Sequence, residues 1–182
     1  MLKRADQALY ADKATRRPLA TTARLDAVAA AGLLDAATDP ELQALSATVA
    51  KLLGVPIVAV SLVAESHQVF LAQCGLGSEA EDGLPLTHTF CGHTVAARRP
   101  LLVGDARSHP LLKDSPAIDE LGLIAYAGFP LADVDGHVVG AVCAIDSAPH
   151  AWSADDTAIL ARLAALAAHQ LAAPARDGLP AR

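Results

Sequence analysis

The fold of this chain of 182 residues is decided by residues 124–145, IAYAGFPLADVDGHVVGAVCAI. Two apolar runs, 124–131 and 137–145, flank the dipeptide Asp135-Gly136. Asp-Gly between two such runs is a strong signal for a β-hairpin, because both residues tolerate the positive φ that a tight turn needs. We therefore predict two adjacent antiparallel strands on either side of this turn.

The same signals occur closer to the N-terminus. A β-branched run at 55–63 is followed, after Glu65-Ser66, by a second run at 67–74, which predicts another pair of adjacent strands. A brief strand is expected at 101–103. Residues 75–86 form a polar, Gly-rich stretch that predicts a loop, and 105–116, which contains two prolines, predicts a loop or a broken helix.

Helices are predicted at both ends of this pattern. Asp39-Pro40-Glu41 supplies an N-cap, a proline at the first position and an acidic first turn for a helix that Gly54 ends. Further helices are expected over 2–15, 22–31, 87–99 (capped by Thr87 or Thr89) and 155–172. Hairpin strands between terminal helices favour an α+β fold around an antiparallel sheet.

Composition and charge exclude several classes of protein. The net charge is −6, but residues 1–24 carry +4 and residues 25–182 carry −10, so the acidic body would repel nucleic acid. No apolar run reaches the roughly 18 residues that span a bilayer, and the start lacks the apolar region of a secretory signal. Three widely spaced cysteines do not form a disulfide framework. We expect a cytoplasmic protein with no membrane or nucleic-acid partner.

Residues 87–94, THTFCGHT, hold the densest group of reactive side chains. Phe90 and Cys91 could simply pack inward, since cysteine is often a small buried hydrophobe, and this interpretation is favoured. Cys91 between two histidines could instead be a thiol with a lowered pKa. His88, Cys91 and His93 could also bind zinc, but no fourth ligand has the spacing of known zinc sites, so we expect no metal.

Other candidate groups favour structural roles. Asp155 and Asp156 suit the first turn of a helix better than acid–base catalysis. Asp105 and Arg107 could form an ion pair that fixes a loop. Cys143 lies within an apolar strand and is expected in the core. The sequence contains no nucleophile-elbow, HExxH or paired CxxC motif, so we predict no catalytic residues.

Several segments together resemble the GAF domains of bacterial sensory proteins. They are Arg24-Leu25 with Gly32-Leu33-Leu34-Asp35, the helix into Leu53-Gly54-Val55-Pro56, Val60-Ser61-Leu62-Val63, Phe90-Cys91-Gly92-His93, Asp105-Ala106-Arg107, Tyr126-Ala127-Gly128-Phe129-Pro130-Leu131 and Gly140-Ala141-Val142-Cys143-Ala144-Ile145-Asp146. The resemblance implies a PAS-like α+β fold, with a central antiparallel sheet of five or six strands flanked by N- and C-terminal helices. It also implies a non-catalytic regulatory domain that either binds a small molecule or acts as a dimeric signalling module. The sequence does not identify a ligand or cofactor.

The resemblance places a small-molecule pocket between the sheet and residues 87–116. Its expected lining is the few polar or aromatic groups of these segments: Phe70, Phe90, Cys91, His93, Asp105, Arg107 and Tyr126. The alternative in the same fold is a free methionine-R-sulfoxide reductase that uses Cys91. We further expect no disulfide in the purified protein.

A second resemblance concerns residues 2–15, LKRADQALYADKAT, which are similar to the closing helix of a GGDEF diguanylate cyclase. It implies a link to cyclic-di-GMP signalling, with a GGDEF domain as a possible effector. The expected organisation is a helical segment or linker at 1–21, a GAF domain at 22–172 and a disordered tail at 173–182.

Two apolar rows on the last helix, including Leu163 and Leu166, predict a homodimer joined through the terminal helices.

Overall fold

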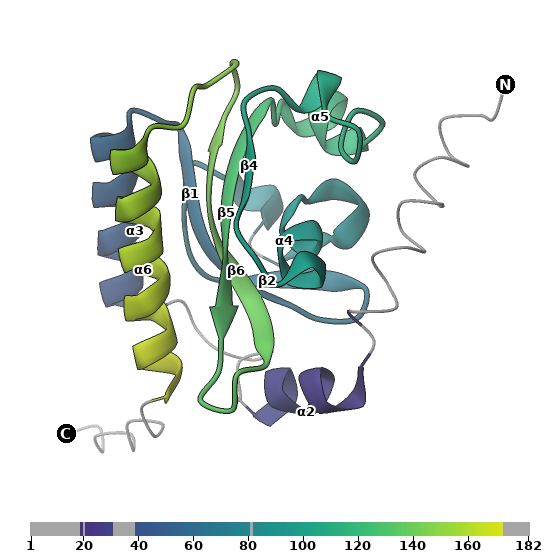
Figure 1. The fold of residues 1–182 in the computed structure, drawn as a ribbon, viewed down its shortest axis with the longest axis vertical. Helices are drawn as coiled ribbons and strands as arrows, with labels where there is room; N and C mark the ends of the chain where they lie inside the picture. The colour runs from purple at the N-terminus through teal and green to yellow at the C-terminus, as the bar shows by residue number, and fades with distance from the viewer. Residues whose placement is uncertain (1–18, 20, 31–38, 81, 173–182) are drawn as a thin grey trace, which may run out of the picture.

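The computed structural model describes residues 19, 21–30, 39–80 and 82–172 (Figure 1). The helix expected at 2–15 and the tail expected at 173–182 lie outside the described residues. Within the described part, an antiparallel sheet has helices on both of its faces. This arrangement confirms the predicted α+β fold.

Among the described residues, six strands form the sheet in the order β3-β2-β1-β6-β5-β4. They are β1 (Ile57–Val63), β2 (His67–Cys74), β3 (Leu84–Pro85), β4 (Leu101–Val103), β5 (Ala125–Ala132) and β6 (Val138–Asp146). Every neighbouring pair is antiparallel. The two central strands, β1 and β6, are buried along almost their whole length because the sheet is covered on both sides.

The β5–β6 hairpin forms as the Asp-Gly signal predicts. Asp133 Oδ1 accepts hydrogen bonds from the backbone N–H groups of Asp135 and His137, at 3.0 and 2.8 Å. Gly136 has φ of +81°, a conformation that most other residues adopt only with strain. Local side-chain and backbone chemistry therefore fixes this turn.

Two long helices, α3 (Pro40–Leu53) and α6 (Ala154–Ala172), lie side by side on one face of the sheet (Figure 1). Asp39 caps α3 by accepting hydrogen bonds from the N–H groups of Glu41 and Leu42, and Gly54 ends it at φ +66°. The opposite face is covered by the short helices α4 (Cys91–Ala97) and α5 (Pro116–Leu121). Helix α2 (Thr22–Ala30) lies near the end of the sheet where the β5–β6 turn is found.

Each face of the sheet has its own core. The α3–α6 core contains the strand residues Val58, Val60 and Leu62 together with Leu160 and Leu163 of α6. The α4–α5 core contains, among others, Leu19, Ile57, Ala59, Phe90, Val95, Leu112, Tyr126, Ala141 and Cys143. Alternate residues of β1 enter the two cores because successive strand side chains point to opposite faces.

The structure differs from the sequence predictions in three short elements. Strand β3 lies within 75–86, where a loop was expected, and helix α5 begins at Pro116 and continues over residues for which no element was predicted. The helix expected at 87–99 is split into a 3₁₀ turn (Leu86–His88) and α4. The β3 pairing needs Gln68 and Leu84 to meet across the sheet, a contact that local periodicity does not reveal. Of the two candidate caps, Thr89 contacts α4, since its Oγ1 accepts the Cys91 N–H at 3.0 Å.

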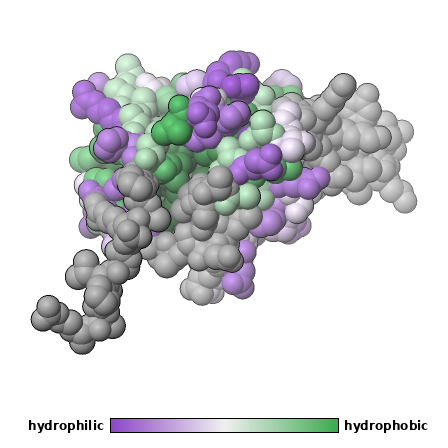
Figure 2. Space-filling model, turned by 90° about the horizontal axis from the view of Figure 1, so that it is seen from below, coloured by the Kyte–Doolittle hydropathy of each residue, from purple (hydrophilic) through white to green (hydrophobic). Residues whose placement is uncertain are grey.

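Within the described residues, no helix combines the length and the apolar character needed to cross a membrane. Seen from below, hydrophobic and hydrophilic side chains are interspersed over the described surface (Figure 2).

Candidate functional site

A group of polar side chains is buried between the sheet and α4. We call it the buried polar cluster; its members are Ser61, Gln68, Thr89, Cys91, Thr94, Tyr126 and Cys143, none more than 5% exposed. They come from β1, β2, β5, β6, α4 and the turn before α4. The residues around them are the apolar members of the α4–α5 core. Most polar side chains in protein interiors need partners, so the cluster is a defined polar site inside an apolar layer.

Hydrogen bonds connect members of the cluster to one another and to the backbone. Thr89 Oγ1 donates to Gln68 Oε1 at 2.8 Å, and Thr94 Oγ1 lies 2.8 Å from Tyr126 Oη. Ser61 Oγ donates to the backbone oxygen of Ala141 at 3.2 Å. The side chains thus link α4 and its preceding turn to β2 and β5.

The thiols of Cys91 and Cys143 lie 3.6 Å apart in this cluster, between α4 and β6. Hydrogen bonding from Cys143 lowers the pKa of Cys91 to about 7, although burial opposes this change. The same interaction, together with burial, raises the pKa of Cys143 well above its usual value. Burial also raises the pKa of Tyr126. At neutral pH, therefore, Cys91 is the thiol of this pair that loses a proton first.

Three of the site residues predicted from the sequence come together here. Phe90 and Tyr126 are buried with ring centroids 5.5 Å apart and perpendicular planes, and both belong to the same core as Cys91. Phe70 is half-buried and packs against that core. His93 is half-buried on α4, where burial lowers its pKa, with a further lowering from the charge of His109.

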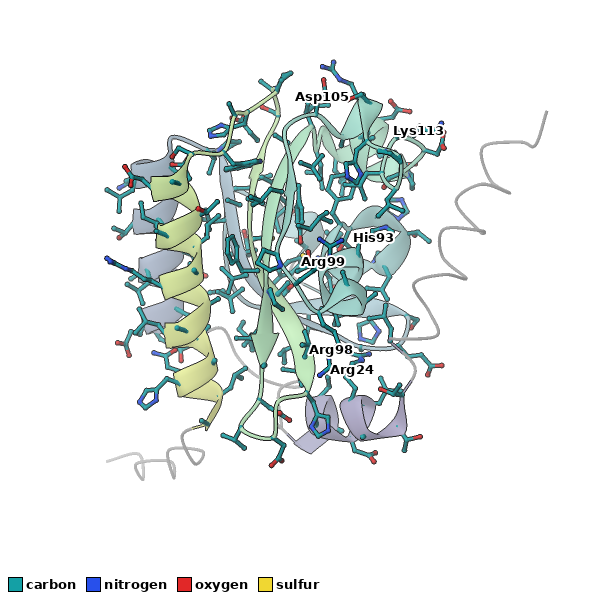
Figure 3. The ribbon with its side chains drawn as sticks, in the orientation of Figure 1. Arg24, His93, Arg98, Arg99, Asp105 and Lys113 are labelled. Atoms are coloured by element: carbon teal, nitrogen blue, oxygen red, sulfur yellow. The ribbon has the colours of Figure 1, made fainter. Side chains whose placement is uncertain are left out.

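The other two predicted residues, Asp105 and Arg107, form an ion pair at the protein surface. Arg107 Nη2 lies 2.7 Å from Asp105 Oδ2, and their side chains are 55% and 29% exposed. Asp105 also accepts the Arg107 N–H and so caps the short turn Ala106–Ser108. Figure 3 shows Asp105 at the end of the sheet near α5, away from His93 on α4. This geometry fits the loop-fixing role considered for the pair.

The possible zinc ligands are not gathered at one point in the described part of the chain. His88 Nε2 pairs with Glu120 Oε2 at 3.0 Å, whereas Cys91 is buried under α4. A different group, Asp133, Asp135 and His137, has ligand atoms within 4.8 Å of one another, but it lies in the β5–β6 turn. There Asp133 already bonds the turn backbone and His137 Nδ1.

Sequence reasoning missed five members of the cluster as site residues: Ser61, Gln68, Thr89, Thr94 and Cys143, the last of which was expected only in the core. One signal was present for Ser61, a hydroxyl in the middle of the otherwise apolar run IVAVSLV. Gln68 gave no comparable signal, because a glutamine near the start of a strand is usually solvated. Its burial depends on Thr89, which is 21 residues away in the sequence.

Comparison with known proteins identifies the class to which this fold and site belong. Residues 38–171 match the GAF domain family, and the chain belongs to that family. It is also 30% identical over 137 residues to a cyclic di-GMP phosphodiesterase of Pseudomonas aeruginosa. The match covers 74% of this chain but only 23% of that protein's length.

Solved structures show the same fold. The GAF domain of an Acinetobacter phosphoenolpyruvate-protein phosphotransferase aligns with a TM-score of 0.60 and 17% identity, over 83% of this chain and 94% of that one. A free methionine-R-sulfoxide reductase of Neisseria meningitidis, solved with its substrate, aligns with a TM-score of 0.59 and 22% identity, over 78% and 83%. At these identities the similarity establishes the fold alone.

Proposed function

We propose that this chain is a non-catalytic regulatory GAF domain that binds a small molecule at the buried polar cluster. The observation that carries the proposal is the asymmetry of the two cores. The long helices α3 and α6 cover a core dominated by apolar side chains, whereas the polar cluster lies under the short helix α4. Sites for small molecules are mostly apolar with a few convergent polar groups, and this side of the sheet has that character.

The similarity to a cyclic di-GMP phosphodiesterase supports a role in cyclic-di-GMP signalling. In that role the domain would act in the cytoplasm, and ligand binding would change the activity of a neighbouring catalytic domain such as a GGDEF domain. The resemblance of residues 2–15 to the end of such a domain is consistent with this proposal. Those residues lie outside the described part of the structure.

Native mass spectrometry of freshly purified protein tests ligand binding directly. We expect a co-purified small molecule, and we expect Tyr126→Phe to reduce its retention about tenfold, which corresponds to roughly 1.4 kcal/mol. The substitution removes the hydroxyl that bonds Thr94 Oγ1 and leaves the aromatic ring in place. Ser46→Ala is the matched control, because Ser46 is buried on the opposite face and its Oγ makes no hydrogen bond in the described structure. Equal retention by both variants would contradict the proposed site.

We also propose a homodimer through the outer surface of the α3–α6 layer. Leu52 of α3 and Leu166 of α6 are 67% and 50% exposed. Exposed leucines on neighbouring helices, next to small alanines on α6, suit close packing against a second copy. Leu163, which the sequence suggested as a dimer residue, is instead 2% exposed and lies in the core.

Light scattering after size exclusion is expected to show twice the chain mass of 18.6 kDa at about 100 μM protein, well above the Kd of a stable interface. The double substitution Leu52→Glu with Leu166→Glu is expected to give a folded monomer, since both side chains are exposed. Leu111→Glu is the control: Leu111 is 56% exposed but lies in the loop before α5. A monomeric wild-type chain would refute this interface.

The competing function is reduction of free methionine-R-sulfoxide by Cys91. The lowered pKa of Cys91 favours it, because the thiolate is the reactive form. Its 2% exposure does not separate the two functions, because a methionine-sized substrate and the proposed ligand would both need a local opening to reach this cluster. Turnover of free methionine-R-sulfoxide with a dithiol reductant, lost in Cys91→Ser, would replace the sensory proposal with this one.

A further inference from the structure

Cys91 and Cys143 form a buried pair of thiols whose sequence separation of 52 residues gave no hint of contact. We propose that they are a redox-active dithiol, which a hydroperoxide converts to an intramolecular disulfide between α4 and β6. The proposal is independent of the ligand proposed above, because it concerns only these two sulfur atoms and a small oxidant.

The geometry places the two sulfurs within reach of each other. Their separation is 3.6 Å, and a disulfide needs about 2.05 Å, so the pair must close by about 1.5 Å. Cys91 is in the first turn of α4, and Cys143 is on the central strand β6. A modest change of side-chain torsion with a small movement of α4 would bring them together, because α4 is a short helix of 7 residues.

The chemistry of the pair assigns different roles to the two cysteines. Cys91 is the thiol that ionises at neutral pH, and the hydroxyls of Tyr126, Ser61 and Thr89 assist its ionisation. A thiolate is the nucleophile in oxidation by peroxide, so Cys91 reacts first. Cys143 lies 3.6 Å from Cys91, a position that suits the resolving thiol. Its pKa is raised first by the hydrogen bond with Cys91, and also by burial and by the charge of Cys91. Oxidation of Cys91 removes that charge and so favours ionisation of Cys143 for the second step.

The reaction balances with hydrogen peroxide as the oxidant. The Cys91 sulfur attacks one peroxide oxygen; the S–O bond forms, the O–O bond breaks, and the departing hydroxide takes up a proton to give water. The Cys143 sulfur then attacks the Cys91 sulfenic acid, the S–S bond forms, and the S–O bond breaks. The released hydroxide takes the proton that Cys143 loses. In total two thiols lose two electrons, and one peroxide becomes two waters.

Oxidant must reach a site that is 1–2% exposed in the resting structure. The elements before Cys91 are β3, of 2 residues, and a 3₁₀ turn of 3 residues, with half-buried or exposed side chains. Short elements with few buried contacts open locally at lower free energy than the central strands do. Peroxide is close to water in size, so such an opening admits it while excluding larger oxidants.

The consequence of oxidation is a covalent link between α4 and the centre of the sheet. Thr89, two residues before Cys91, donates a side-chain hydrogen bond to Gln68 of β2. Strand β6, which carries Cys143, pairs with both β1 and β5. Moving the Cys91 sulfur therefore changes its hydrogen bonding with Tyr126, Ser61 and Thr89 of the buried polar cluster. Oxidation of the pair would therefore change the structure of the same region that is proposed to bind the ligand.

The test uses the full chain, reduced and then treated with one equivalent of hydrogen peroxide. After denaturation and alkylation we expect the number of alkylated cysteines to fall from three to one, Cys74, and to return to three after dithiothreitol. Trypsin leaves Cys74 and Cys91 on one peptide, 52–98, so a second cleavage after Glu79 or Glu81 is needed to separate them. The linked peptides should then contain Cys91 and Cys143 and be lighter by two hydrogen atoms than the two free thiol peptides together.

Two variants test which cysteines form the disulfide and which one is oxidised first. Cys74→Ser should form the same link, whereas Cys143→Ala should leave Cys91 as a sulfenic acid that dimedone traps. Full alkylation of Cys91 and Cys143 after peroxide, a link through Cys74, or irreversible oxidation of Cys91 in the wild-type chain would each overturn the proposal. Because the wild-type peptide map alone distinguishes these results, the test holds even if Cys143→Ala fails to fold.

Discussion

Leu163→Glu is expected to unfold the domain. Leu163 is 2% exposed in the α3–α6 core, where it packs with residues of the sheet. Truncating a buried leucine to alanine already costs about 2–5 kcal/mol. A carboxylate there would also lose its hydration or be forced to take up a proton, which adds several kcal/mol. The sum is comparable to the roughly 5–15 kcal/mol that stabilises a typical domain.

Circular dichroism and urea denaturation at neutral pH measure this effect, with Leu166→Glu as the matched control. Leu166 lies on the same helix, three residues further along, but is 50% exposed. Its substitution should change the free energy of unfolding of the monomer by less than about 0.5 kcal/mol. A cooperatively folded Leu163→Glu chain with a stability close to wild type would mean that Leu163 does not face the sheet.

Gly140→Ala is expected to cause the second large loss of stability. Gly140 is on β6 opposite Leu62 of β1, and a Cβ atom added there would lie 1.9 Å from the backbone oxygen of Ser61. The colliding atom belongs to the backbone of the central strand, so no side-chain rotation relieves the contact. Overpacking in a core typically costs 1–3 kcal/mol, and we expect a cost above about 3 kcal/mol because two paired strands must separate.

Gly77→Ala is the control for this substitution. A Cβ atom at Gly77 meets nothing within 4 Å, and its backbone φ is not in the left-handed region. Alanine there should be neutral or slightly stabilising, because it reduces the freedom of the unfolded chain. Chemical denaturation of both variants checks the prediction; equal midpoints would show that β1 and β6 do not approach each other as closely as described.

The sequence alone determined the parts of this protein whose signals are local. Asp135-Gly136 and its flanking runs specify the β5–β6 hairpin, and Asp39, Pro40 and Gly54 specify both ends of α3. Turn geometry and helix caps depend on residues within a few positions of one another, so the order of the residues is enough to predict them. The combination of such segments also identified the family.

Only the tertiary structure decided which side chains meet across the sheet. The contact between Cys91 and Cys143 spans 52 positions, and the bond between Thr89 and Gln68 spans 21. The same holds for Leu163, which the apolar pattern of α6 suggested as a dimer residue and which the structure places in the core. Burial and polar contacts of this kind depend on how α4 and α6 are placed against the sheet, and this placement results from the summed packing of both cores. No local pattern of residues encodes that summed packing. The fold could therefore be predicted from local signals in the sequence, whereas the residues that make up the buried polar cluster could not.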